Sequence, residues 1–287
     1  MANIPRLNGA IRALENKQTV FASFSPAEIG IAQAIGNASY DAIVFEMEHA
    51  PYDAKLLRDC FQYLLNRSQI ASGATLAPAV TPMVRIPPNG GEMNQWLAKQ
   101  VLDMGAYGVI WPHISTVEEA RNAVASCRYP RPPNALHADP AGRRGDGPKI
   151  AAPYWGLSQQ AYYERADVWP LNPTGEILVG IICEDVLGVR NLRKILEQVP
   201  GIGLVIIGEG DLSQELGCPR QYDHPAVISA VDEILGVCKE QGVACGHAHV
   251  DKENIGVLIN RGFSWLMTPP VFSFALLEQG RRLAGRN

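Results

Sequence analysis

Short apolar runs alternate with longer segments whose apolar residues recur every three to four positions, almost from one end of the chain to the other. The runs are rich in β-branched residues and apolar at successive positions, which is typical of strands buried on both faces of a parallel sheet. The predicted strands are residues 19–24, 41–46, 80–86, 107–111, 176–183, 203–207, 243–247 and 264–268. Helical segments between them predict repeated strand–helix units.

The predicted helices have an apolar face or recognisable end signals. In residues 53–66 the apolar positions keep a 3.6-residue period. Further helices are indicated by a capping box from Ser115 to Glu118 opening a helix to about residue 127, by Pro225 in a first turn, and by Asp251 and Gly262 as caps of residues 252–261. These helices would cover the outside of a parallel sheet.

Eight strand–helix periods predict a closed (β/α)₈ barrel forming a single domain over residues 1–287, with an open doubly wound sheet as the alternative. Two stretches break the rhythm. Residues 67–79 read as a flexible connection. Residues 128–175 are rich in Pro, Gly, Arg and aromatic residues, and so long an irregular segment is typical of a lid, a binding loop or a subunit contact.

Composition and charge narrow the possible partners. With 47% hydrophobic and 19% charged residues the chain can bury a large core, and a net charge of -4 gives no reason to expect nucleic acid or anionic membranes as partners. The N-terminus is polar, and no apolar run is long enough to span a bilayer. The six cysteines are scattered and mostly lie in apolar runs, so we expect reduced thiols in a cytoplasmic protein.

Reactive groups of a barrel enzyme collect where the strands end. The polar residues at the predicted strand ends are Glu46, Glu48, His49, Arg85, His113, Glu184, Asp185, Glu209, Asp211, His247 and His249. The sequence therefore predicts an acidic mouth that contains one arginine and several histidines.

Glu184 and Asp211 are the candidate metal ligands. Glu184 ends the apolar run ILVGIIC, and Asp211 follows the next strand. Because neighbouring strands lie about 5 Å apart, the two carboxylates would repel each other unless a cation neutralised them. A hard divalent cation held by two protein ligands keeps positions for the vicinal oxygens of a 2-oxo acid. The alternative is a pair of surface carboxylates at helix starts.

Arg85 and His49 are candidates for binding and proton transfer. Arg85 ends a buried strand and can grip a substrate oxygen, or it can form a structural ion pair with Glu46 or Glu48. His49 lies just past a strand end among carboxylates, where it can transfer a proton; the alternative is a packed or surface histidine. Asp103, late in its predicted helix, reads from its position alone as a surface residue.

Other chemistries have weak support. His247 and His249 could offer two zinc ligands, but the sequence places no third ligand near them. The chain has no GxSxG motif, and the predicted strands contain no lysine for Schiff-base chemistry.

The chain resembles the HpcH/HpaI family of metal-dependent pyruvate aldolases from about residue 20 to 284. The matching motifs are Glu48-His49-Ala50-Pro51, Val84-Arg85, Leu102-Asp103-Met104-Gly105, Arg144-Gly145 and Gly208-x-x-Asp211-Leu212-Ser213. The resemblance implies a barrel often assembled as trimers or hexamers, and Mg²⁺, Mn²⁺ or Co²⁺ held by Glu184 and Asp211. It also implies an enolate stabilised by Arg85, and proton transfer assisted by a His49–Asp103 pair.

We expect further substrate contacts from residues in or beside these motifs, namely Glu48, Arg144, Gly208, Glu209 and Gly210. The chain departs from the family pattern at three places. Ile182 replaces a glutamine, Glu46 replaces an aspartate, and Gly-Glu-Gly-Asp replaces Gly-Pro-Ala-Asp after the sixth predicted strand. The last change adds a charge beside the expected metal.

The expected reaction is cleavage of a 4-hydroxy-2-oxo acid into pyruvate and an aldehyde. The small-molecule substrate would bind a divalent cation through its carboxylate and keto oxygens. Oxaloacetate decarboxylation or cleavage of a CoA thioester would use the same enolate. A catalytically silent barrel that serves as a binding or assembly subunit is the non-enzymatic alternative.

Overall fold

The computed structural model describes residues 5–73, 75–87, 90–268 and 274–286. Within these residues, eight parallel strands form a ring that is closed by pairing between β4 and β6. The ring consists of β1 (Val20–Pro26), β2 (Ala42–Glu46), β3 (Thr81–Arg85), β4 (Gly108–Trp111), β6 (Ile177–Cys183), β7 (Leu204–Ile207), β8 (Ala244–His247) and β9 (Trp265–Met267). The predicted (β/α)₈ barrel is confirmed, and the closed ring excludes the open sheet.

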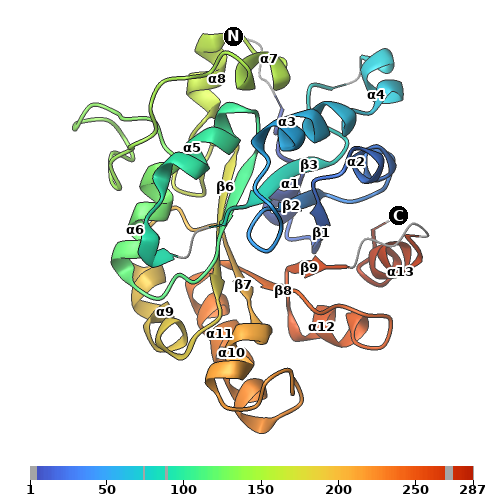
Figure 1. Ribbon diagram of the computed structural model, residues 1–287, viewed down its shortest axis with the longest axis vertical. Helices are drawn as coiled ribbons and strands as arrows, with labels where there is room; N and C mark the ends of the chain where they lie inside the picture. Colours follow the sequence, from blue (N-terminus) through green and yellow to red (C-terminus); the bar gives the residue numbers. More distant parts are fainter. Residues whose placement is uncertain (1–4, 74, 88–89, 269–273, 287) are drawn as a thin grey trace.

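Helices surround this ring (Figure 1). They are α1 (Gly9–Glu15), α2 (Ile29–Ile35), α3 (Ala54–Tyr63), α4 (Arg67–Ser72), α5 (Gln95–Asp103), α6 (Val117–Ser126), α7 (Ala151–Tyr154), α8 (Gln159–Arg165), α9 (Val186–Gln198), α10 (Glu209–Glu215), α11 (Pro225–Gln241), α12 (Ile255–Arg261) and α13 (Ala275–Leu283), with a 3₁₀ turn at Gly90–Glu92. The apolar period of residues 53–66 is confirmed by α3, and Pro225 occupies the first turn of α11.

The strands bury side chains on both faces, as their continuous apolar sequences predict. Phe21 and Phe45 point toward the helices, whereas Val20, Ala22 and Val44 point into the barrel. Helix α1 packs against this inner cluster through Ala10 and Ile11 and closes the barrel at the N-terminal ends of the strands. The polar residues after the strands therefore meet at the opposite, C-terminal mouth.

The capping box of α6 lies one residue later than predicted. Thr116, not Ser115, is the N-cap, and its partner is Glu119 rather than Glu118. The Glu119 carboxylate accepts hydrogen bonds from the backbone N–H groups of both Ser115 and Thr116, so the predicted cap residue still contributes a donor.

Two other predictions from the sequence need correction. Helix α12 starts after Asn254, and Asp251 caps the preceding turn by accepting from the N–H groups of residues 253 and 254. Gly262 ends the helix in the left-handed conformation, as predicted. The segment 67–79, predicted as a flexible connection, contains α4, a short helix with no buried residue and therefore no apolar periodicity to detect.

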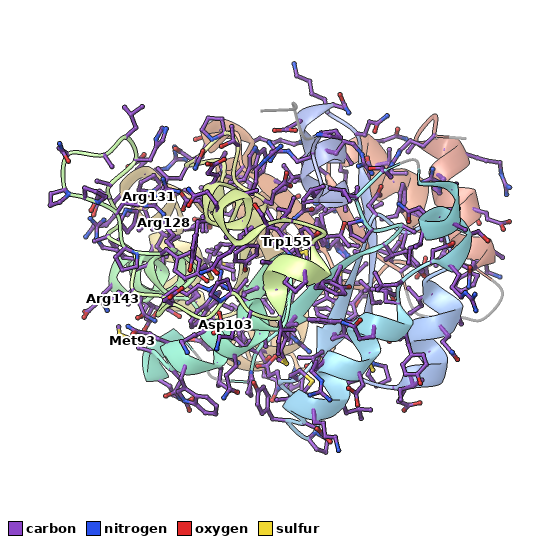
Figure 2. All side chains as sticks on the ribbon, turned by 90° about the horizontal axis from the view of Figure 1, so that it is seen from above. Met93, Asp103, Arg128, Arg131, Arg143 and Trp155 are labelled. Carbon is purple, nitrogen blue, oxygen red and sulfur yellow. The ribbon has the colours of Figure 1, made fainter. Side chains whose placement is uncertain are left out.

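The excursion 128–175 contains α7, α8 and the short strand β5 (Val168–Trp169). Trp155 donates to Gly105 O at 2.8 Å and stacks on Tyr107 at 4.1 Å, just before β4. Arg128 and Arg131, labelled near each other in Figure 2, both form ion pairs with the buried Asp167. The excursion is therefore packed against the N-terminal side of β4, on the other end of that strand from the mouth.

None of the described helices is both long and apolar enough to cross a lipid bilayer.

Candidate active site

A pocket of about 570 Å³ lies at the C-terminal mouth of the barrel. Its walls come from residues at or beyond the C-terminal ends of different strands, namely Phe24, His49, Arg85, Glu184, Gly208, Glu209, Gly210, Asp211, Gln214, Arg220, Tyr222, Ala248 and His249. The structure thus brings together the predicted metal ligands, the predicted arginine and histidine, and the glycine-rich turn after β7. No residue of the excursion 128–175 lines this pocket.

His113, Glu184 and Asp211 form a potential metal-binding triad, since their ligand atoms lie within 4.8 Å of one another. The register of β4 and β6 brings His113 close to Glu184. Trp111 of β4 pairs with Ile181 of β6, and His113 and Glu184 lie two and three residues beyond this pair. The predicted pair of carboxylates is thus joined by a histidine from a third strand end.

His113 has a left-handed backbone, with φ of 51°. This conformation is costly for a side chain with a Cβ atom, although histidine adopts it more readily than most residues. It directs the backbone N–H of His113 to Glu184 Oε1 at 2.6 Å, and His113 Nε2 lies 3.7 Å from the same oxygen. The strained turn therefore fixes both the carboxylate and the imidazole of the triad.

The electrostatics of the triad favour a cation. The pKa of Glu184 is raised to about 8, mainly by burial and also by the nearby Glu48 and Asp211, against the opposing hydrogen bond from the His113 N–H. Burial likewise raises the pKa of Glu48. A divalent cation would relieve this repulsion, and two carboxylates with one imidazole form a suitable ligand set. The residues present therefore fit a divalent metal.

Arg85 faces these carboxylates from the end of β3. Its Nε donates to Glu46 Oε2 at 2.8 Å, and its Nη1 lies 3.0 Å from Glu48 Oε2. The Glu46 pairing follows from register, since Glu46 and Arg85 are partners in the β2–β3 ladder. The guanidinium also packs over the Phe24 ring at 4.4 Å. The structural ion pairs considered from the sequence are present, and they hold the guanidinium at the pocket wall.

His49 is the more exposed of the two imidazoles that line the pocket, with 67% of its side chain exposed against 44% for His249. Its backbone N–H donates to Glu46 Oε1 at 3.2 Å, so the same carboxylate positions both Arg85 and the turn that carries His49. The nearest carboxylate oxygen to its ring is Glu48 Oε2, 3.6 Å from Nε2. An exposed imidazole beside a pocket is suited to exchanging protons with a bound substrate or with water.

Asp103 and Arg144 do not line this pocket. Asp103 ends α5 and accepts from Arg144 Nη2 at 2.9 Å, with Lys99 at 3.5 Å. Arg144 is buried and also donates to Tyr162 Oη at 2.8 Å. Within the described part of one chain, Asp103 contacts Arg144 and Lys99 and has no described contact with His49, and Arg144 contacts Asp103 and Tyr162. The cause is the packing of the excursion, which brings Arg144 to the end of α5.

His247 and His249 pair with a carboxylate and do not form a zinc site among the described residues. His249 Nδ1 lies 2.7 Å from Glu209 Oε2, and His247 Nε2 lies 3.5 Å from Glu209 Oε1. Although burial opposes ionisation of Glu209, the hydrogen bonds from both imidazoles outweigh it and lower the pKa of Glu209 to about 2. The charge that departs from the family pattern is thus held by two histidines of β8 and its following loop.

Sequence reasoning missed three contributors to the mouth. His113 was recognised at a strand end but not as a metal ligand, because its reach depends on a left-handed turn. Phe24 and Tyr222 line the pocket from β1 and from the loop after α10. Phe24 falls at the end of a predicted strand, which was a usable signal. Tyr222 lies in an irregular loop whose position no local pattern specifies.

The proteins similar to the chain include two curated aldolases and one solved structure. It is 28% identical to a hydroxypyruvate/pyruvate aldolase of Roseobacter denitrificans, over 98% of this chain and 97% of that protein. It is 32% identical to a 2-keto-3-deoxy-L-rhamnonate aldolase of Klebsiella pneumoniae, over 77% of this chain and 71% of that protein. A crystal structure of an HpcH/HpaI aldolase/citrate lyase family protein from Burkholderia cenocepacia matches with a TM-score of 0.76 and 25% identity, covering 96% and 97% of the two chains.

The family model for HpcH/HpaI aldolase/citrate lyase matches residues 20–266, a span that contains the whole strand ring except the final residue of β9. The resemblance noted from the sequence motifs is confirmed by this match and by the aldolases above. The chain therefore belongs to the HpcH/HpaI aldolase/citrate lyase family and is a carbon–carbon lyase of the aldolase type.

Proposed function

We propose that the protein is a divalent-metal-dependent aldolase that cleaves a 4-hydroxy-2-oxo acid into pyruvate and an aldehyde. The observation that carries the proposal is the convergence of His113, Glu184 and Asp211 opposite Arg85 at the mouth of an aldolase-family barrel. The names of the two curated aldolases, which refer to pyruvate and to 2-keto acids, support a substrate of this class.

The cation would be held by Glu184, Asp211 and His113 and would supply Lewis-acid stabilisation of negative charge on the 2-oxo acid. Arg85 faces the same space and stabilises the oxygen on which charge develops as the C3–C4 bond breaks. Its ion pairs with Glu46 and Glu48 hold the guanidinium in place before substrate binds. Little reorganisation is then needed in the transition state.

His49 accepts the proton of the substrate 4-hydroxyl group, directly or through one water molecule. Its exposed imidazole can reach a substrate in the pocket, and Glu48 Oε2 lies 3.6 Å from its Nε2. In this proposal Glu48 takes the place beside His49 that the resemblance had given to Asp103.

The ligand set also favours particular metals. Carboxylates suit Mg²⁺ and Mn²⁺, whereas an imidazole ligand shifts preference toward transition metals. We expect Mn²⁺ or Co²⁺ to bind more tightly than Mg²⁺, and His113→Ala to reduce that difference.

The test is removal of metal with a chelator, followed by titration with Mn²⁺ while pyruvate release from a 4-hydroxy-2-oxo acid is measured. Activity should disappear and return with the metal. Exchange of pyruvate methyl protons in deuterated water reports enolate formation without any aldehyde, and an oxaloacetate assay separates cleavage from decarboxylation. Full activity in metal-free protein would overturn the proposal.

Variants assign the roles. Glu184→Gln and Asp211→Asn should lose metal binding by calorimetry, whereas Arg85→Ala should keep the metal and lose rate by about 100-fold or more. Glu197→Gln, on the exposed face of α9, is the matched control and should leave metal binding as in the unmodified protein.

A further inference from the structure

The pocket of about 570 Å³ that is lined by Glu184 and Asp211 is called the metal pocket below. A second pocket, of about 660 Å³, opens beside it. The two pockets share five lining residues, namely Phe24, Glu209, Tyr222, Ala248 and His249. The second pocket extends from this shared wall toward α12, where Val257, Leu258 and Arg261 line it. A 2-oxo acid held next to Glu184 and Asp211 has a direct route for the rest of its carbon chain into this space.

The shared wall is a preformed polar unit. The Glu209 carboxylate bridges His249 at 2.7 Å and His247 at 3.5 Å, and only 6% of its side chain is exposed. The Tyr222 ring stacks on the His249 ring at 4.5 Å. The loop after β8 is braced as well, because Asn254 donates to His249 O at 2.9 Å. The wall is therefore held rigidly by contacts within the chain.

Polar groups of this wall lack partners among the described residues. His247 Nδ1 and Tyr222 Oη are buried and form no hydrogen bond, and 92% of the His247 side chain is removed from solvent. Pairing of His249 through Nδ1 leaves its Nε2 without a described hydrogen bond. Buried polar groups are normally paired, so this wall is suited to a ligand that brings its own polar atoms. A hydroxyl group both donates and accepts, and it can match an imidazole in either tautomer.

The charges of the second pocket disfavour an anionic ligand. Glu209 and Asp251 both line it, and the guanidinium of Arg261 is already bound by Asp232 at 2.5 Å. A distal carboxylate would therefore face two acids without a free cation among the lining residues. Apolar walls from Val257 and Leu258 accommodate the carbon chain between its polar groups.

We propose that the second pocket, bounded by Glu209, Tyr222, His247 and His249, binds the aldehyde half of the substrate and selects neutral, hydroxyl-bearing aldehydes. This inference rests on the proposed aldolase function and specifies its substrate class. The residues of the pocket position the hydroxylated chain, while the metal-binding triad and Arg85 act on the pyruvate half.

The experiment measures aldol addition of pyruvate to three aldehydes by the metal-loaded enzyme: glyceraldehyde, which is neutral and hydroxylated, propanal, which lacks the hydroxyls, and succinic semialdehyde, which carries a carboxylate. We expect kcat/KM for glyceraldehyde to exceed that for propanal by about tenfold or more. His249→Phe should abolish most of this ratio, and His249→Gln, which keeps a hydrogen-bonding side chain, should restore part of it. Because both kcat/KM values are measured on the same protein sample, their ratio does not depend on the fraction of the enzyme that is folded.

His137→Phe is the matched control, because His137 is exposed in the excursion, away from both pockets, and its ratio should equal that of the unmodified enzyme. Equal rates with glyceraldehyde and propanal would overturn the inference. So would a preference for succinic semialdehyde that Arg220→Met removes, since Arg220 lines the metal pocket. Failure of the metal-loaded enzyme to exchange pyruvate methyl protons would instead overturn the proposed function itself.

Discussion

Gly208 lines the metal pocket at a position where a side chain would clash with Glu184. A Cβ atom there would lie 2.5 Å from Glu184 Oε2 and 2.4 Å from Glu184 Cβ. Both distances are shorter than any normal contact, and Glu184 cannot yield because it follows a fully buried strand. The glycine after β7 therefore creates the space in which the carboxylate of the preceding strand end faces the site.

Gly208→Ala should therefore displace Glu184 and weaken metal binding by about 10- to 100-fold, since groups that orient a ligand have effects of this size. Isothermal titration with Mn²⁺ measures the change. Gly210→Ala is the matched control, because nothing lies within 4 Å of a Cβ at that position. Unchanged metal affinity in Gly208→Ala would contradict the placement of Glu184.

The raised pKa of Glu184 predicts a pH-dependent response to metal. In metal-free protein this carboxyl has a pKa of about 8 against 4.5 for an unperturbed glutamate. It therefore favours folding most when protonated, below about pH 4.5, and that contribution is lost as the pH rises toward 8. A bound cation stabilises the ionised form, so the metal-induced rise in Tm should be larger at pH 8 than at pH 6.

Differential scanning fluorimetry at the two pH values measures this rise. Glu184→Gln has no charge to titrate at this position and should show little metal-induced shift at either pH. A larger rise at pH 6 than at pH 8 would contradict the sign of the pKa shift.

Among the elements, the excursion 128–175 has its first residue joined to a residue near its end by a buried ion pair. Arg128 Nε donates to Asp167 Oδ1 at 2.7 Å, and both side chains are only 1% exposed. The same guanidinium donates to the carbonyl groups of His137 and Pro140. Loss of the carboxylate charge would leave a buried cation whose partners are carbonyl oxygens alone.

Asp167→Asn should therefore lower the free energy of unfolding by about 3 kcal/mol, as measured by urea denaturation. Asp139→Asn is the matched control, because Asp139 pairs with Arg121 on the surface with 67% of its side chain exposed, and it should change stability by less than about 0.5 kcal/mol. Equal effects of the two substitutions would show that this pair does not stabilise the folded excursion.

The strands of the barrel could be predicted from the sequence because each is buried on both faces. Such burial requires apolar residues at successive positions, which appear in the sequence as continuous apolar runs. Helix α4 could not, because it buries nothing. The contact of Glu209 with His249 depends on register: Ile207 pairs with His247, and each side chain lies two residues beyond the paired strand ends. The placement of Asp103 and Arg144 depends on where a long irregular segment packs, which no local pattern specifies.

At the scale of the whole molecule, both chain ends contribute to the closed end of the barrel. Helix α1 fills it, and Arg286 donates to both oxygens of Asp41 at 2.7 Å and to Thr19 O at 2.6 Å. Asp41 in turn accepts from the N–H of Phe21 at 2.8 Å. The Arg286–Asp41 ion pair thus ties the segment after α13 to the starts of β1 and β2, far from the mouth.

Arg286→Ala should accordingly lower the free energy of unfolding by about 1.5–3 kcal/mol, the usual range for hydrogen bonds to charged groups, measured by urea denaturation. The metal affinity of the folded protein should stay unchanged, because the two ends of the barrel are separated by the length of its strands. Arg282→Ala, on the exposed face of α13, is the control and should have little effect on either quantity. A loss of metal affinity in Arg286→Ala would show that the two ends are coupled.

Three residues within four consecutive positions of the turn after β7 have different roles in the proposed enzyme: Gly208 leaves room for the Glu184 carboxylate, Glu209 anchors the wall of the second pocket, and Asp211 belongs to the potential metal-binding triad. Attempts to redirect the enzyme toward other aldehydes by altering this turn would therefore disturb cation retention at the same time. The α12 side of the second pocket, at Val257 and Leu258, is separate from the triad. Laboratory evolution for new products should accumulate its tolerated changes there.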